Sequence, residues 1–136
     1  MGKVQILAVL TMDGCLSSEL YDKAHQDLCL DRCGLDEIRK KAFYRVTPDY
    51  SISMLHEWRK DCTNIRYLAE ATPDTADYIN GLLRMHAVDE IILYTVPFIS
   101  GSGRHFFKSA LPEQHWTLSS LKSYPNGVCR IIYILD

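Results

Sequence analysis

The sequence predicts an α/β fold, a three-layer α/β/α sandwich whose mixed, mainly parallel sheet ends in an antiparallel hairpin. Strand-like apolar runs alternate with helix-like segments through the first two thirds of the chain, which favours parallel strands joined by helices. Two further strand-like runs flank a turn, Pro125-Asn126-Gly127, near the end. With 136 residues, 47% of them hydrophobic, the chain can bury the core of a single domain over residues 1–136.

The first third of the chain predicts one strand and two helices. Residues 3–11 (KVQILAVLT) are apolar and rich in strand formers, and Asp13-Gly14 supplies the turn that ends them. Residues 20–41 carry apolar side chains at helical spacing. Gly34 is expected to divide this segment into two helices, the second of which starts directly after it.

A strand, a helix and another strand are expected next. Residues 43–47 (FYRVT) form a short strand that Pro48 ends. Ser51 can cap a helix that runs through Trp58. Residues 64–69 (NIRYLA) form the second strand of this unit.

A helix start and a long strand follow. Thr72 is a cap residue, Pro73 suits the first turn, and the acid Asp74 suits the helix dipole. One face of this helix is expected to be apolar and buried: Ala76, Ile79, Leu82, Leu83 and Ala87. Residues 89–99 then form a strand in which Pro97 cannot donate to the ladder, so this part is expected at an edge or a bulge.

The last two strands are expected to pair with each other. Residues 116–123 (WTLSSLKS) alternate apolar and polar side chains, and residues 128–135 (VCRIIYIL) return after the turn. Their separation by a short turn predicts the antiparallel hairpin.

Composition and charge argue against several classes of partner. The formal net charge is −2, which argues against a nucleic-acid partner, and no basic stripe is visible. Residues 4–10 are too short for a signal-peptide core, and no apolar run reaches membrane-spanning length, so we expect a cytoplasmic protein without a membrane partner. The five cysteines are an odd number without the paired spacing of a zinc site, so we expect reduced thiols and no metal.

Three segments carry a resemblance to a known family. They are the opening ILAVLTMDGCLS, the segment VDEIILYTVPFISGSGRHFF, and the ending WTLSSLKSYPNGVCRIIYIL. Together they resemble the dihydrofolate reductase-like family, and more closely the reductase domain of bacterial riboflavin-biosynthesis enzymes and its stand-alone relatives. These segments cover somewhat under half of the chain, and the later ones are the more specific.

The resemblance implies an oxidoreductase that transfers a hydride from NADPH to a small pterin-like or pyrimidine substrate. It implies that the cofactor lies across the carboxyl ends of the strands, as ligands generally do in open α/β sheets. Asp13 is then the candidate catalytic residue. The candidate cofactor-binding residues are Met12, Gly14, Ala71, Thr72, Thr75, Gly101 and Ser102.

The middle of the chain departs from the family's pattern. Family members are longer before the pyrophosphate-binding helix and have a Gly-Gly loop at its start, where this chain reads YLAEATPDTADYI. Glu70 and Asp74 lie there, and carboxylates repel a phosphate. A second hypothesis is therefore a shortened, non-catalytic member that binds another small ligand or works as a homodimer. An unrelated α/β binding fold is a third hypothesis.

Two local alternatives stay open. The Gly101-Ser102-Gly103 loop, followed by Arg104 and His105, could hold an anion or could form a sheet corner while Phe106 or Phe107 packs inside; we favour the corner. Asp13 could lie near a substrate or could bond its own turn. Cys15, directly after that turn, could be a reactive thiol or a small core residue, and we favour the core residue.

Overall fold

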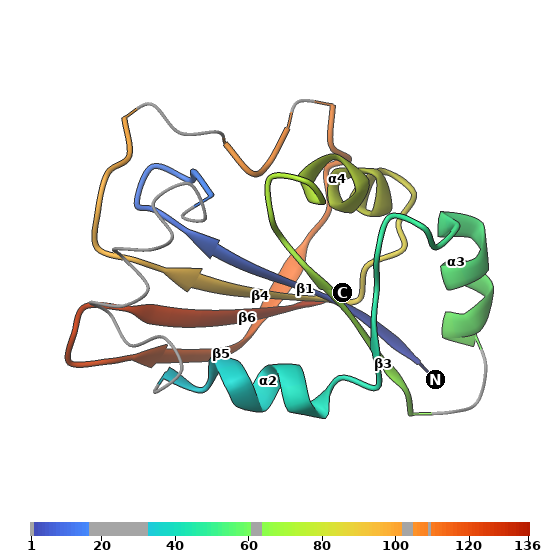
Figure 1. Ribbon diagram of the computed structural model, residues 1–136, viewed down its shortest axis with the longest axis horizontal. Helices are drawn as coiled ribbons and strands as arrows, with labels where there is room; N and C mark the ends of the chain where they lie inside the picture. The colour runs from blue at the N-terminus through green and yellow to red at the C-terminus, as the bar shows by residue number, and fades with distance from the viewer. Residues whose placement is uncertain (1, 17–32, 61–63, 102–104, 109) are drawn as a thin grey trace.

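A six-stranded mixed sheet organises the computed structural model (Figure 1). The structure describes residues 2–16, 33–60, 64–101, 105–108 and 110–136. The strands are β1 (Lys3–Leu10), β2 (Tyr44–Arg45), β3 (Arg66–Glu70), β4 (Glu90–Thr95), β5 (Trp116–Ser123) and β6 (Cys129–Leu135). The helices are α2 (Leu35–Lys41), α3 (Ile52–Lys60) and α4 (Ala76–Arg84).

The strand order in the sheet is β2-β3-β1-β4-β6-β5. Strands β2, β3, β1 and β4 are parallel, whereas β6 pairs antiparallel with both β4 and β5. The predicted mixed sheet and its closing antiparallel hairpin are therefore confirmed. The register of the hairpin shifts between Leu118 and Ser120, as at a β-bulge.

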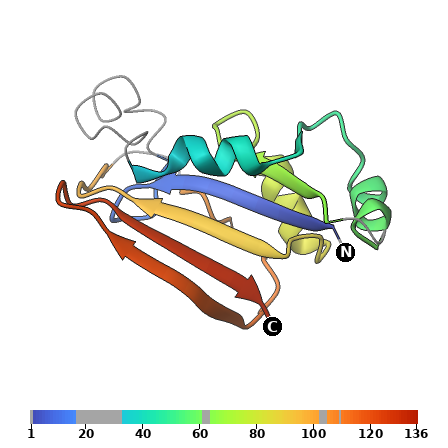
Figure 2. The same cartoon turned by 90° about the horizontal axis from the view of Figure 1, so that it is seen from below.

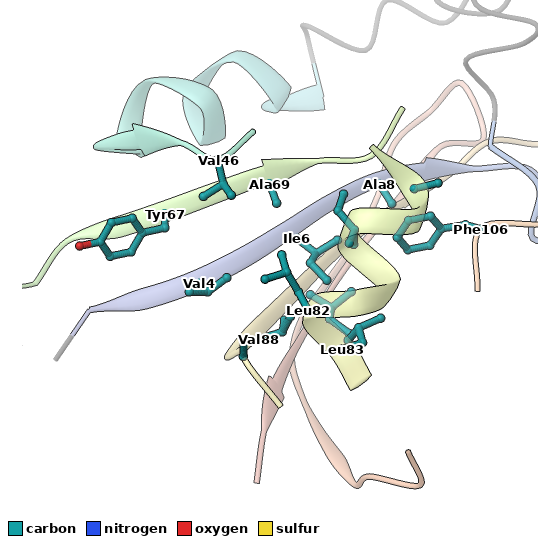
Figure 3. Close-up of a cluster of buried hydrophobic side chains, with 14 of the residues drawn as sticks. Val4, Ile6, Ala8, Val46, Tyr67, Ala69, Leu82, Leu83, Val88 and Phe106 are labelled. Atoms are coloured by element: carbon teal, nitrogen blue, oxygen red, sulfur yellow. The ribbon is translucent and has the colours of Figure 1, made fainter. Parts of the chain in front are cut away.

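Helices cover both faces of the sheet (Figures 1 and 2). Successive side chains of a strand point to opposite faces, and β1 divides accordingly between two apolar clusters. Val4, Ile6 and Ala8 pack in the cluster that contains the buried residues of α4 (Figure 3). Leu7 packs in the other cluster with Leu35 of α2. This arrangement confirms the α/β sandwich.

Helix α4 buries the face that its sequence predicts. Ala76, Ile79, Leu82 and Leu83 are buried as expected, and so is Ala87, which lies beyond the end of the helix at Arg84. The N-cap is Thr75, however, and not Thr72 as expected, so regular helix begins at Ala76. The carbonyl of Thr72 accepts from the amides of Thr75 and Ala76, so a turn precedes the helix and occupies the predicted first positions.

The strand predicted over residues 89–99 is wrong in its length, and the part around Pro97, expected at an edge or a bulge, lies beyond the strand. Strand β4 ends at Thr95, whose partner Cys129 closes the ladder, and β4 lies inside the sheet between β1 and β6. Pro97 lies beyond the last pair, so its missing N–H costs the sheet nothing. The hairpin turn packs on it: a Cβ at Gly127 would lie 3.2 Å from Cγ of Pro97.

The expected helix start directly after Gly34 is confirmed, since this residue has a left-handed backbone (φ 82°) immediately before α2. The helix predicted before it lies outside the described residues. The short strand predicted over residues 43–47 is reduced to β2. Within the described ranges, no helix is long and apolar enough to cross a membrane. The same residues contain no group of three or more potential metal-binding side chains.

Candidate functional site

The carboxyl ends of β1 and β4 lie side by side and carry the two loops that the sequence singles out. The strands pair in parallel up to Leu10 and Thr95. The turn after β1 then meets the segment after β4, where the amide of Met12 donates to the carbonyl of Phe98 at 2.7 Å. This junction is the edge at which open α/β sheets bind their ligands.

The Asp13 carboxylate joins these two loops. It accepts hydrogen bonds from the hydroxyl of Thr11, the amide of Ser100 at 3.1 Å and the amide of Gly101 at 3.0 Å. The bond from Thr11, followed by those from Gly101 and Ser100, holds the pKa of Asp13 well below its ordinary value. Asp13 is therefore ionised at neutral pH and anchors the corner. Its predicted catalytic role stays a prediction, and in this state the group cannot donate a proton.

Cys15 and Phe106 complete the corner. Cys15 is buried, its amide donates to the Thr11 hydroxyl at 3.1 Å, and its main chain bridges to His105. This burial favours the core residue over the reactive thiol. Gly101 has a left-handed backbone (φ 74°) and Phe106 is fully buried, as a sheet corner requires. Ser102, with its two successors, lies outside the described residues.

The main-chain amides at the junction between β3 and α4 donate hydrogen bonds to acceptors within the protein. The amide of Ala71 donates to the carbonyl of Leu7 at 2.7 Å, that of Thr72 to Oγ1 of Thr75 at 2.8 Å, and that of Thr75 to the carbonyl of Thr72 at 3.1 Å. The amide of Gly14 likewise donates to the carbonyl of Thr11. All described residues of the predicted cofactor set thus have main-chain amides with internal acceptors. They do not form an open cradle of amides for a diphosphate.

Glu70 at this junction is compensated by a cation. It is the last residue of β3, and its carboxylate forms an ion pair with the guanidinium of Arg39 on α2. Asp74 is exposed. Both acids were expected to repel a phosphate, but Arg39, 31 positions before Glu70 in the chain, offsets the charge of Glu70.

A cavity of about 290 Å³ opens at the start of α4. Its lining residues are Leu16, Pro73, Ala76, Asp77, His105 and Lys108. Lys108 and His105 offer hydrogen-bond donors, and Asp77 offers acceptors. Neither Lys108 nor Asp77 forms an ion pair with another described residue. The cavity is therefore lined by an ammonium and a carboxylate, neither of which has an ion-pair partner among the described residues.

Asn80 of α4 was missed by the sequence argument and supports one wall of this cavity. Its side chain is fully buried, and Nδ2 donates to the carbonyls of Ala76 and Phe106, both at 2.8 Å. Its Oδ1 accepts from the amide of Lys108 at 3.0 Å. The signal was present in the sequence, since an amide side chain stands among the apolar residues of the buried face.

No protein-family model and no curated protein matches the sequence. Solved structures match its fold. A protein assigned to riboflavin biosynthesis from Shewanella sp. PV-4 aligns with a TM-score of 0.62 at 10% identity, over 98% of this chain and 99% of that chain. RibD from Acinetobacter baumannii aligns with a TM-score of 0.65 at 11% identity, over 100% of this chain and 58% of that chain.

A third match is dihydrofolate reductase from Enterococcus faecalis, solved in complex with NADP(H) and RAB-propyl. It aligns with a TM-score of 0.59 at 11% identity, over 98% of this chain and 96% of that chain. The chain therefore has an α/β fold of the dihydrofolate reductase-like class. Within that class its fold is similar to those of the riboflavin-biosynthesis protein and RibD, as the sequence resemblance predicts.

Proposed function

We propose that the chain is a small NADPH-dependent oxidoreductase that acts on a pterin-like or pyrimidine substrate. The observation that carries this proposal is the cavity at the start of α4, at the carboxyl edge of a dihydrofolate reductase-like sheet. Ligands of open α/β sheets bind at this edge. The structurally similar Enterococcus faecalis reductase was solved with NADP(H), which supports the choice of cofactor.

The residues of the cavity fit the anionic part of this cofactor through side chains. The amides of Ala71, Thr72 and Thr75 have internal acceptors, whereas Lys108 and His105 offer donors that suit a phosphate. Asp77 suits the hydroxyl groups of a sugar. When bound, NADPH supplies a hydride. The cavity is near the lower limit of ligand pockets, roughly 300–1,000 Å³, so it would hold only part of a dinucleotide.

A second candidate is a binding domain without redox activity, and the state of Asp13 favours it. Reduction of a heterocycle by hydride needs a proton as well, and the hydrogen bonds from Thr11, Ser100 and Gly101 keep Asp13 ionised. In this case the same cavity would take a small anionic molecule other than NADPH. Binding without turnover would distinguish this candidate from the reductase.

Titration with NADPH tests the proposal. Nicotinamide fluorescence and the midpoint of thermal unfolding are followed for the native chain, for Lys108→Met, and for Lys60→Met as a matched control on the exposed end of α3. We expect saturable binding that Lys108→Met weakens about tenfold, because a charge–phosphate hydrogen bond is lost, and that the control leaves unchanged. No saturable response at millimolar NADPH would show that the proposal is wrong. Loss of absorbance at 340 nm with a dihydropterin or an aminopyrimidine then separates turnover from binding.

A further inference from the structure

Asn80 is a polar side chain at a position that the fold would otherwise fill with an apolar one. It lies on the buried face of α4 with a relative exposure of 0%, next to Ile79. Burying an amide is unfavourable unless its hydrogen bonds are made inside the protein. Here both its nitrogen and its oxygen have partners, and two of the three partners belong to one segment, Phe106 to Lys108.

The segment that Asn80 holds is one wall of the cavity. Its carbonyl at Phe106 and its amide at Lys108 both bond to Asn80, 26 and 28 positions earlier in the chain. On its other side the amide of Phe106 donates to the carbonyl of Gly14 at 3.1 Å. The segment is thus fixed between α4 and the turn after β1, whose residue Leu16 also lines the cavity.

We propose that Asn80 is a positioning residue that holds this segment against α4 and so fixes Lys108 on the cavity wall. The inference rests on the proposed function, in which Lys108 meets the negative group of the ligand. An apolar side chain of similar size would fill the space, but it would leave the Phe106 carbonyl and the Lys108 amide without these partners. Lys108 would then lose its fixed distance from Asp77 and from the start of α4.

Amide hydrogen exchange tests the positioning without any ligand. The variants are Asn80→Leu, Asn80→Ala as a smaller replacement, and Ile79→Val, a matched control that removes one methyl group from the same helix face. We expect the Lys108 amide to exchange at least about tenfold faster in both Asn80 variants, because its acceptor is gone. In Ile79→Val the exchange rate of the Lys108 amide should change only as much as the change in global stability requires. An unchanged Lys108 rate in the folded Asn80 variants overturns the proposal.

A double-mutant cycle tests whether Asn80 acts on binding through Lys108. The dissociation constant of NADPH is measured for the native chain, Asn80→Leu, Lys108→Met and the double variant. We expect each single change to weaken binding about tenfold and the double variant to be no weaker than Lys108→Met within about twofold. Additive losses, about a hundredfold in the double variant, would show that Asn80 does not act through Lys108.

The two failures are distinguishable. If the native chain does not bind NADPH, the proposed function is wrong. The exchange rate of the Lys108 amide then still decides whether Asn80 holds the segment Phe106 to Lys108. If NADPH binds and Asn80→Leu leaves both its affinity and the exchange rate unchanged, the function stands and the role of Asn80 is refuted.

Discussion

Asp13 shows how one carboxylate in a turn can join two loops at the edge of a sheet. Its carboxylate binds the Thr11 hydroxyl and two amides of the loop after β4, which links the ends of two strands. The sequence indicated the turn, because Asp-Gly is a local signal. It could not indicate the bonds to Ser100 and Gly101, which are 87 and 88 positions away.

Asp13→Asn should lower the stability of the fold above pH 4. The folded-state pKa of Asp13 lies below its unfolded value of 3.8, so the ionised group stabilises the folded chain above that pH. The contribution is lost as the pH falls below about 4. Thermal unfolding between pH 2 and pH 7 checks this. The difference in midpoint between native chain and variant should be largest at neutral pH and shrink on acidification. A difference that grows at low pH would contradict the assignment.

Arg39→Met should destabilise the chain by about 1 kcal/mol, because Glu70 would lose its partner in a partly buried ion pair. Urea unfolding measures this, with Lys40→Met as the control on an exposed neighbour in α2. The difference between the two variants should become smaller in high salt. Equal stabilities of the two variants would show that the pair contributes nothing.

At the scale of single elements, helix α4 was the most predictable part of the fold. Its apolar residues recur every three or four positions, and that local period alone identifies the buried face. Its predicted start was wrong by three residues, because Thr72 and Thr75 form a hydrogen-bonded turn before the regular helix. Such side-chain turns compete with the first helical turn in sequences of this composition.

Leu82→Ala in this helix should cost about 2–5 kcal/mol of unfolding free energy, because it opens a cavity in the cluster between α4 and the sheet. The exposed Met85 at the end of the same helix provides the comparison, and Met85→Ala should change stability by less than about 0.5 kcal/mol. Chemical denaturation of both variants measures the difference. A loss below 1 kcal/mol for Leu82→Ala would mean that this face is not the core.

Over the whole molecule, local patterns predicted the strands and the pairing of the last two, but not the order of the other strands in the sheet. Alternation along the chain indicates a parallel sheet, and the resemblance to reductases indicated the layers. The candidate site depends on contacts that sequence spacing does not show. Asn80 contacts Lys108 because the fold places α4 next to residues 105–108. Arg39 contacts Glu70 because the fold places α2 next to the end of β3.

We propose that the chain forms a homodimer through the free edge of β5, as the sequence led us to expect. The opposite edge strand, β2, has two residues, whereas β5 has eight and exposes Leu118 and Leu121 at 51% and 63%. A long edge with exposed apolar side chains is a template for pairing with another chain. Light scattering should give twice the chain mass for the native protein and the chain mass for Leu121→Lys. A native monomer at about 100 μM would contradict this.

A crystal structure of the chain soaked with NADPH would decide how the cavity is used. We predict electron density for a phosphate group within hydrogen-bond distance of the Lys108 ammonium, and none on the amides of Ala71, Thr72 and Thr75, which keep their internal acceptors. A phosphate seated on those three amides, with Lys108 turned away, would contradict the assignment of the cavity and of its charge.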